Sequence, residues 1–218
     1  VGRLISPDPR DAASASDSRT VVFDIGNVLI RWDREFLYRE LIPDDAQRAH
    51  FLDHVLTLED NAALDRGMTL REMTADVARR HPEHEELVLA FRHRWRDTLG
   101  PVIDGSVAIL GALREAGIRC LALSNWSADT FAMVEDEYPF FAWFEGLVIS
   151  GREGVVKPDP EIFHLLCRRH DVDPTNAVFI DDSTANIEAA SRLGFETVHF
   201  TDPDALRTHL VQLGLLAA

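Results

Sequence analysis

Cysteines and long hydrophobic runs are scarce in this sequence. Its 218 residues include only two cysteines, Cys120 and Cys167, and they do not form a CxxC pair. The absence of that spacing excludes the usual zinc and redox motifs, so both residues are expected to be buried, reduced thiols. No apolar run approaches the roughly 18 to 20 residues of a membrane helix, and the first residues lack the apolar segment of a secretory signal. We therefore expect a cytoplasmic protein.

Positive charge is also scarce relative to negative charge. The chain carries 22 Lys and Arg residues against 37 Asp and Glu residues, a formal net charge of -15 at pH 7. The long-range field of such a chain repels nucleic acid and anionic membranes, which excludes both as partners. A small anion responds to local charge instead, so a small phosphorylated substrate is compatible with this composition.

Short apolar runs rich in Val, Ile, Phe and Leu predict buried strands. These runs are residues 21–30, 118–123, 147–149, 177–180 and 196–200. Segments with helical spacing separate the later runs, one of them beginning at Asp159 and Pro160, which suit a helix start. Strands that alternate with helices predict a parallel sheet, and continuous apolar strands predict burial on both faces. The expected fold class is α/β, a three-layer doubly wound parallel sheet, with the active site beyond the carboxyl ends of its strands.

Two segments fall outside this alternation. Residues 1–19, rich in Ser, Ala, Asp and Pro without periodicity, are expected to be a weakly ordered leader without chemistry. The interval 33–103 is too long for a single crossover helix and shows helical spacing, which predicts a small all-α cap over the strand ends. The α/β core then comprises residues 20–32 and 104–218.

Polar side chains stand at four places where a predicted strand ends or the next helix begins. They are Asp24, the pair Ser124 and Asn125, Lys157 before Pro158, and the pair Asp181 and Asp182. Each feature alone has an ordinary structural explanation, as a turn, a helix cap or an exposed charge. Their joint placement favours one site, because the carboxyl ends of parallel strands meet at the same edge of a sheet.

The adjacent acids predict a cation at this edge. Two neighbouring carboxylates repel each other, so an uncompensated Asp181 and Asp182 pair costs stability. Asp24 and Asp182 would supply the hard oxygen ligands that Mg²⁺ prefers, with a backbone carbonyl, a substrate phosphate and water around the same ion. Ser124 and Lys157 would hold the remaining phosphate oxygens. Attack of Asp24 on phosphorus would give an aspartyl-phosphate, which splits hydrolysis into two easier steps.

In order, spacing and residue type, these motifs resemble those of the haloacid dehalogenase-like hydrolase superfamily. The resemblance covers nearly the whole chain from Thr20 onward, and the helical insertion resembles that family's cap. Because members of this type are mostly phosphatases, it implies a Mg²⁺-dependent hydrolase of a small phosphorylated metabolite. The implied roles are Asp24 as nucleophile, Lys157 as bridge between phosphate and nucleophile, Ser124, Asn125, Gly26 and Asn27 as phosphate-binding residues, Asp24, Gly26 and Asp182 as metal ligands, and Asp181 and Asn186 as supporting residues.

The pattern departs from that family at Gly26. Phosphatases of the family usually carry a second Asp two residues after the nucleophile, as general acid and base. Such help is typically worth about 10² to 10⁴ in rate. Gly26 can offer its carbonyl to the metal, but it cannot protonate a leaving alcohol or activate water. We expect slower turnover, another acid, or a leaving group that needs little protonation.

The missing acid leaves three functional interpretations open. The segment 23–28 resembles that of bacterial sugar-phosphate phosphatases similar to α-glucose-1-phosphate phosphatases, and Trp32 and Trp126 would wall the pocket and stack on a sugar ring. Dehalogenases of the same superfamily also lack the second Asp, and they use the nucleophile on carbon without a metal. A non-catalytic phosphate-binding or regulatory protein would keep the site without the acid. The pair Asp181 and Asp182 favours the metal-dependent phosphatase.

Overall fold

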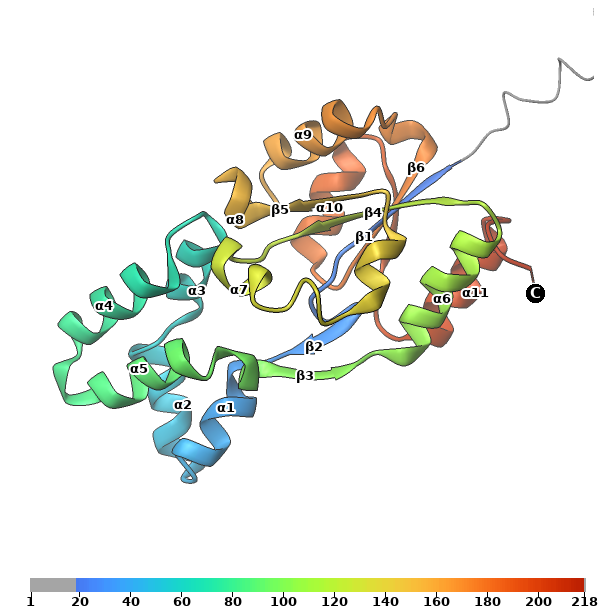
Figure 1. The fold of residues 1–218 in the computed structure, drawn as a ribbon. Coiled ribbons are helices and arrows are strands. Elements are labelled where there is room, and N and C mark those ends of the chain that lie inside the picture. Colours follow the sequence, from blue (N-terminus) through green and yellow to red (C-terminus); the bar gives the residue numbers. More distant parts are fainter. Residues whose placement is uncertain (1–18, 218) are drawn as a thin grey trace, which may run out of the picture.

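A five-stranded parallel sheet forms the centre of the computed structural model, which describes residues 19–217 (Figure 1). Its strand order is β5-β4-β1-β6-β7. The strands are β1 (Thr20–Phe23), β4 (Arg119–Ser124), β5 (Gly146–Ile149), β6 (Ala177–Asp181) and β7 (Glu196–His199). The first strand therefore lies in the middle of the sheet, so the residue that follows it reaches the centre of the carboxyl edge. The predicted leader, residues 1–19, lies outside the described residues apart from Arg19.

Helices cover both faces of this sheet and make three layers. One face packs against α6 (Asp104–Glu115) and α11 (Pro203–Gln212), and the other against α9 (Pro160–His170) and α10 (Thr184–Arg192). Successive residues of β1 point to opposite faces, since Val21 and Phe23 belong to one buried apolar cluster and Val22 to the other. The predicted α/β fold class, with strands buried on both sides, is confirmed.

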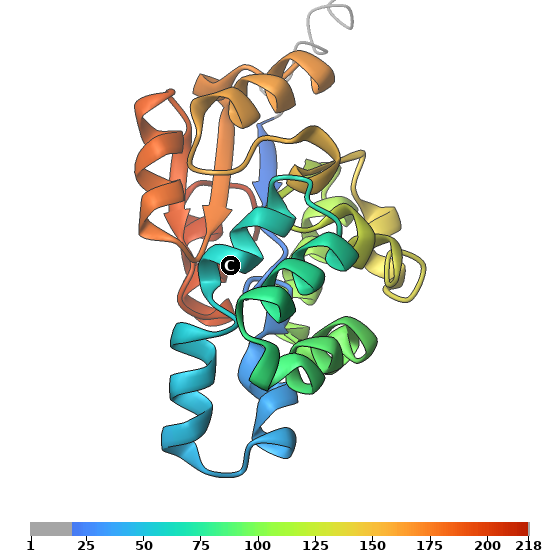
Figure 2. The same ribbon diagram turned by 90° about the vertical axis from the view of Figure 1, so that its left-hand side faces the viewer.

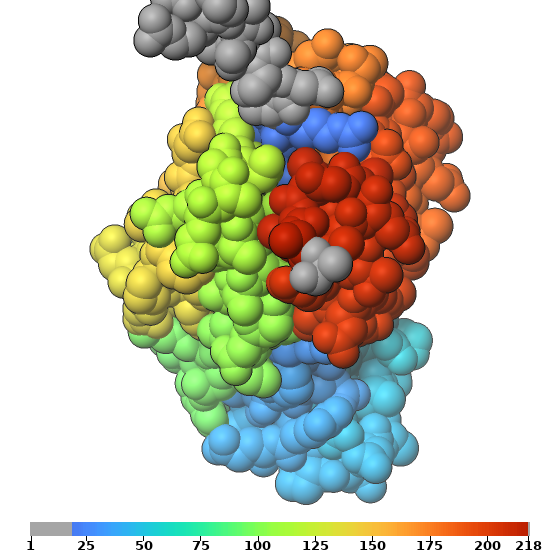
Figure 3. Space-filling view, turned by 90° about the vertical axis from the view of Figure 1, so that its right-hand side faces the viewer, coloured from blue at the N-terminus to red at the C-terminus, as the bar shows by residue number. Residues whose placement is uncertain are grey.

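The face formed by α6 and α11 shows how closely the outer layer packs (Figure 3). The two helices contact each other, and the start of α6 lies against the start of α11. A Cβ atom at Gly105 would lie 2.6 Å from the Cβ of Pro203, closer than two carbons can approach. Only glycine fits at this point without a shift of the backbone.

The chain leaves the core for the cap through a short two-stranded ribbon. Antiparallel strands β2 (Ile30–Trp32) and β3 (Leu99–Val102) form it. The predicted strand 21–30 was therefore wrong in extent, because a turn after Asp24 breaks the apolar run into β1 and β2. Of the two cysteines, Cys120 is buried as expected, whereas Cys167 is only half-buried, and both are free thiols.

Helices make up the interval between these two ribbon strands (Figures 1 and 2). They are α1 (Arg34–Leu41), α2 (Asp45–His54), α3 (Leu58–Asp65), α4 (Leu70–Arg80) and α5 (Glu85–His93), with 3₁₀ turns η1 (Pro82–His84) and η2 (Trp95–Thr98). Capping boxes begin two of them: Thr57 with Asp60 at α3, and Thr69 with Glu72 at α4. These caps fix where each helix starts, and hence which residues of α3 reach the core.

Short elements on the core side complete the fold and receive the cap. They are α7 (Ala128–Ala132), η3 (Pro139–Trp143), α8 (Ser150–Glu153) and η4 (Pro174–Asn176). Asp129 of α7 accepts a 2.9 Å hydrogen bond from the backbone N–H of Leu70, the first residue of α4. A Cβ atom on Gly67 would lie 3.4 Å from the carbonyl oxygen of Gly151, so the loop between α3 and α4 rests on α8.

Among the described helices, none combines the length and the apolar character needed to cross a membrane.

Candidate functional site

The parallel register brings Asp24 to the carboxyl edge between two other strand ends. Phe23 pairs with Ala122 of β4 on one side and with Ile180 of β6 on the other. Asp24 therefore lies one residue beyond the paired strand, level with the end of β6, and its backbone N–H donates to the Ile180 carbonyl at 2.9 Å. The structure brings together the acids that the sequence analysis placed at separate strand ends.

A tight turn follows Asp24 and uses most of the polar groups of Asn27. This residue has a left-handed backbone (φ 55°), which asparagine tolerates better than most residues. Its N–H donates to the Ile30 carbonyl at 2.7 Å, and its side-chain oxygen accepts from the Trp32 N–H at 3.1 Å. The backbone N–H of Asn27 is thus not free for phosphate, and its side-chain NH₂ is the one donor of this residue left for an anion.

Lys157 joins the strand ends through its ammonium group. Its Nζ atom donates to the Leu123 carbonyl at 2.7 Å and to Asp181 Oδ2 at 2.7 Å, and it lies 3.0 Å from Asp24 Oδ1. These three contacts use all three protons of an ammonium group. Burial by itself lowers the pKa of Lys157, but the charges of Asp181 and Asp24 outweigh burial and raise this pKa above its ordinary value. The amine is therefore held as a cation inside the protein.

Asn125 fixes the backbone that carries this lysine. Its side-chain oxygen accepts from the Lys157 N–H at 2.8 Å, and its NH₂ group donates to the Lys157 carbonyl at 2.8 Å. The Lys157–Pro158 peptide bond in the same turn is cis. Asn125 thus acts on the lysine turn, with one N–H left for a phosphate, whereas Ser124 is the buried last residue of β4.

Asp181 and Asp182 have different surroundings despite their adjacency. Asp181 is fully buried and accepts from Lys157, from the Ser183 N–H at 2.8 Å and from the Asn186 side chain at 3.0 Å on both oxygens. Asp182 has an exposed side chain, and its own backbone carbonyl lies 2.9 Å from the ring of His199. Asp181 is therefore saturated with donors, while the Asp182 carboxylate is available to a ligand.

The donor set fits a hard divalent cation. Asp24, Asp181 and Asp182 each offer a carboxylate oxygen, and these oxygens lie within 4.8 Å of one another. Because Asp181 is occupied by its donors, Asp24 and Asp182 are the two carboxylates that suit Mg²⁺, which takes one or two carboxylates and keeps several waters. Gly26 follows in the same turn and has a backbone carbonyl to offer.

Without a bound cation, Asp24 and Asp182 hold their protons more tightly than ordinary carboxyl groups do. Burial, reinforced by Asp181 and Asp182 and opposed by Lys157, raises the pKa of Asp24 to about 7. Burial and the charge of Asp181 also raise the pKa of Asp182. Each group is thus costly to ionise where it lies. A divalent cation would favour the ionised forms of both.

We expect Mg²⁺ to raise the melting temperature, and to do so more at pH 8 than at pH 6. At pH 6 the ion must displace a proton from Asp24, whose pKa is about 7. At a concentration of 100 times the dissociation constant, a ligand adds about 2.7 kcal/mol to the free energy of unfolding. Without Mg²⁺, the raised pKa predicts that stability falls as the pH rises from about 4 towards 7, since the folded state binds more protons there.

Differential scanning fluorimetry at both pH values, with magnesium chloride or with EDTA, measures this effect. Asp182→Asn is the control, because it removes one proposed ligand from a largely solvent-facing position. An equal shift at both pH values, or an undiminished shift in Asp182→Asn, would contradict the assignment of the ligands.

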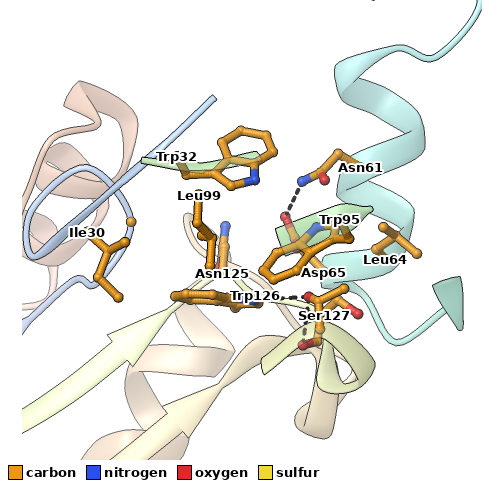
Figure 4. A pocket seen from close by; sticks show the side chains of 12 residues that line it. Ile30, Trp32, Asn61, Leu64, Asp65, Trp95, Leu99, Asn125, Trp126 and Ser127 are labelled. Carbon is orange, nitrogen blue, oxygen red and sulfur yellow. Dashed lines mark hydrogen bonds between the residues drawn. The ribbon is translucent and has the colours of Figure 1, made fainter. Parts of the chain in front are cut away.

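A pocket opens beside the turn that contains Gly26 (Figure 4). Its cavity volume is about 110 Å³, which leaves room for several water-sized groups and hence for a small ligand. In Figure 4, Trp32 and Trp126 lie on opposite sides of the space, and Trp95 adds a third indole with its ring centroid 6.0 Å from that of Trp126. The indole N–H of Trp126 donates to Thr130 at 3.1 Å, which fixes that ring.

The cap supplies pocket residues that the sequence analysis did not identify. Asn61, Leu64 and Asp65 come from α3, and Trp95 comes from η2. Trp32 and Trp126 also line this pocket, and their role at a substrate stays a prediction. Helical spacing indicates which residues share a face of α3, but no local signal shows that this face lies over the sheet edge.

Comparison with known proteins shows the family to which this chain belongs. Residues 18–194 match the family model of haloacid dehalogenase-like hydrolases. The chain is 25% identical over 189 residues to a D-ribitol-5-phosphate phosphatase from Bacteroides thetaiotaomicron, covering 82% of this chain and 90% of that protein. It is 28% identical over 106 residues to a sesquiterpene phosphatase from Aspergillus oryzae, covering 49% of this chain and 54% of that protein. The matched stretch thus spans about half the length of the fungal relative.

Solved structures share the fold. A HAD family enzyme from Bacteroides thetaiotaomicron, in complex with magnesium and inorganic phosphate, superposes with a TM-score of 0.62 at 22% identity, covering 84% of this chain and 94% of that one. The L-2-haloacid dehalogenase from Xanthobacter autotrophicus, with chloropropionic acid covalently bound, superposes with a TM-score of 0.59 at 18% identity, covering 92% and 84%. At these identities the likeness establishes the fold and leaves the choice of reaction to the site.

Proposed function

Because this chain belongs to the haloacid dehalogenase-like hydrolases, we propose that it is a Mg²⁺-dependent phosphohydrolase of small phosphorylated metabolites that uses Asp24 as its nucleophile. The observation that carries the proposal is the charge balance around Lys157. Three carboxylates gather at this edge, and the single ammonium contacts two of them. Asp24 and Asp182 thereby keep oxygens for a second cation, which a metal-free dehalogenation does not require.

The residues of the site suit two successive transfers of the phosphoryl group. A carboxylate oxygen of Asp24 attacks phosphorus, the bond from phosphorus to the leaving oxygen breaks, and an aspartyl-phosphate forms. Water then attacks this phosphorus, and the bond to Asp24 breaks to release inorganic phosphate. Lys157 lies 3.0 Å from Asp24 and offsets negative charge in both steps. When bound, Mg²⁺ supplies Lewis-acid polarisation of the phosphate and offsets its charge.

The other predicted site residues have supporting places in this proposal. In this proposal the hydroxyl of Ser124, at the end of β4, binds the phosphate, and Gly26 and Asn27 form the turn after Asp24. Asn125 positions the lysine turn and keeps one N–H for the phosphate. Asn186 and Lys157 hold Asp181, which in turn orients the ammonium towards Asp24.

A sugar or sugar-alcohol phosphate suits the pocket. Trp32 and Trp126 offer flat apolar surfaces on opposite sides of the space, on which the carbon-bound face of a sugar can pack. Asn61 and Asp65 offer polar groups for hydroxyls on the cap side. One relative that matches along most of this chain is a D-ribitol-5-phosphate phosphatase, which acts on a sugar-alcohol phosphate.

Phosphate release from p-nitrophenyl phosphate and from a panel of sugar and sugar-alcohol phosphates, with Mg²⁺ or with EDTA, tests the proposal. We expect release with Mg²⁺ and at least about a hundredfold less with EDTA, in line with the charge stabilisation that a bound metal supplies. In parallel, chloride release from 2-chloropropionate is measured. This control is needed because this chain, with Gly26, lacks the second Asp, as dehalogenases of the superfamily do. Chloride release without metal would favour dehalogenation, and no turnover of either substrate would favour a phosphate-binding or regulatory protein.

A further inference from the structure

The pocket beside Gly26 has room for a carboxylate that this chain does not place there. A Cβ atom built on Gly26 would meet no other atom within 4 Å, so the turn leaves open space where other phosphatases of the family carry an acid. General acid-base help is worth about 10² to 10⁴ in rate, which makes its complete loss costly. Another group in the same pocket can carry a proton.

Asp65 is the one acid among the described residues that line this pocket. It is the last residue of α3, on the cap, and its Oδ2 atom accepts a 3.2 Å hydrogen bond from the side chain of Asn61. Figure 4 shows this pair on the cap side of the space between Trp32 and Trp126. Within residues 19–217, no Lys, Arg or His forms an ion pair with Asp65. Its carboxyl group is therefore oriented by an amide and not neutralised by a cation.

The surroundings of Asp65 suit proton transfer at neutral pH. Burial raises its pKa to about 7, although Arg66, Lys157 and the Asn61 hydrogen bond each lower it. A group with a pKa near the working pH is present in both protonation states, as an acid-base catalyst requires. Asp65 also lines the same pocket as Gly26, which lies two residues after the Asp24 nucleophile.

Contacts between cap and core hold Asp65 in this place. The loop directly after it rests on α8 at Gly67 and Gly151, and the first N–H of α4 is bound by Asp129 of the core. A catalytic group on a mobile lid would need such anchors to reach a fixed distance from the reacting atoms. The cap thus delivers a specific side chain to the site as well as covering it.

We propose that Asp65 is the general acid and base of this enzyme, supplied by the cap in place of the carboxylate missing at Gly26. The inference rests on the proposed function. As the bond from phosphorus to the leaving oxygen breaks, Asp65 gives its proton to that oxygen, and the alcohol departs neutral. In the second step the Asp65 carboxylate takes a proton from the water that attacks the aspartyl-phosphate, which restores the acid and frees Asp24.

A comparison of leaving groups tests this role in Asp65→Asn. Benzyl phosphate and p-nitrophenyl phosphate have carbon skeletons of similar size, but the benzyl alkoxide is a strong base that needs a proton, whereas p-nitrophenolate leaves without one. We expect Asp65→Asn to lower kcat/KM for benzyl phosphate by about 10² to 10⁴ and for p-nitrophenyl phosphate by less than about tenfold. This contrast reports the chemistry of the leaving group, which a structural role would not affect.

The second step gives an independent signature. Without a base for water, the aspartyl-phosphate should accumulate in Asp65→Asn, so p-nitrophenol should appear as a burst of one equivalent per enzyme followed by slow turnover. Glu59→Gln is the matched control, because Glu59 lies exposed on the same helix and outside the pocket. We expect it to keep the native kcat/KM for both substrates. Adding Gly26→Asp to Asp65→Asn should raise kcat/KM for benzyl phosphate at least about tenfold above the value of Asp65→Asn alone.

The outcomes separate this inference from the proposed function. Equal losses of kcat/KM for both substrates would show that Asp65 binds substrate or supports the fold, and unchanged kinetics would show that it has no role; either result would overturn the inference while phosphatase activity persists. If the native chain releases no phosphate from p-nitrophenyl phosphate with Mg²⁺, the proposed function itself fails, and the inference fails with it.

Discussion

Replacement of Asp24 by Asn is expected to abolish phosphate release, with a loss of about four orders of magnitude or more. The amide keeps the size of the side chain and can still accept from Lys157 and from the Ile25 N–H, which donates to Asp24 Oδ1 at 2.7 Å. It cannot attack phosphorus to form the covalent intermediate. Steady-state release of phosphate from p-nitrophenyl phosphate with Mg²⁺ measures the loss.

The stability of the same variant provides the control. Burial raises the pKa of Asp24 to about 7, which means that the folded protein is destabilised by the charge on this side chain at higher pH. Asn carries no charge, so Asp24→Asn should melt at or above the temperature of the native chain in EDTA at pH 8. Activity retained within tenfold of native in a folded Asp24→Asn protein would rule out Asp24 as the nucleophile.

Replacement of Lys157 by Met should remove activity and also destabilise the fold. The ammonium is the cation in contact with Asp181, whose side chain has no exposed surface. Removing one partner of a buried ion pair costs about 3 to 5 kcal/mol, because the other charge is left uncompensated. Urea denaturation measures this loss in the free energy of unfolding, and phosphate release measures the loss of activity.

A double variant separates the two roles of this lysine. Lys157→Met combined with Asp181→Asn removes both charges, so most of the lost stability should return while activity stays absent. A double variant as unstable as Lys157→Met would show that the packing of the lysine stem, and not the buried charge, stabilises the fold. Recovery of activity in the double variant would contradict the proposed role of Lys157 at the phosphate.

The sheet and the strand-end residues could be predicted from the sequence because their signals are local. A short apolar run followed at once by Asp24, or by Ser124 and Asn125, shows both a buried strand and the polar group at its end. Parallel pairing then places these groups at one edge. The ribbon of β2 and β3 escaped prediction because Ile30 continues the apolar run of the first strand, whereas β3 contains a glycine and a proline that interrupt an apolar strand pattern.

The pocket residues of the cap could not be predicted for a different reason. In the sequence, Asp65 is an ordinary acid near the end of a helix. Its place in the pocket depends on the close approach of Gly67 to Gly151, which holds the end of α3 near the sheet edge. The double hydrogen bond of Asn125 with Lys157 is likewise a contact across 32 positions of the chain. Such contacts depend on tertiary packing, whereas spacing along the chain describes only neighbours on one element.

Lys157 is the single lysine among the 218 residues, and its side chain has no exposed surface. Apart from a free α-amino group, reagents that acylate amines therefore find no amine target on the outside of this protein. Modification at position 157 requires the reagent to enter the catalytic interior and the ammonium to leave its two carboxylates. The rate of acylation at Lys157, followed by mass spectrometry of the peptide that contains it, therefore reports how often the protein opens far enough to release this amine.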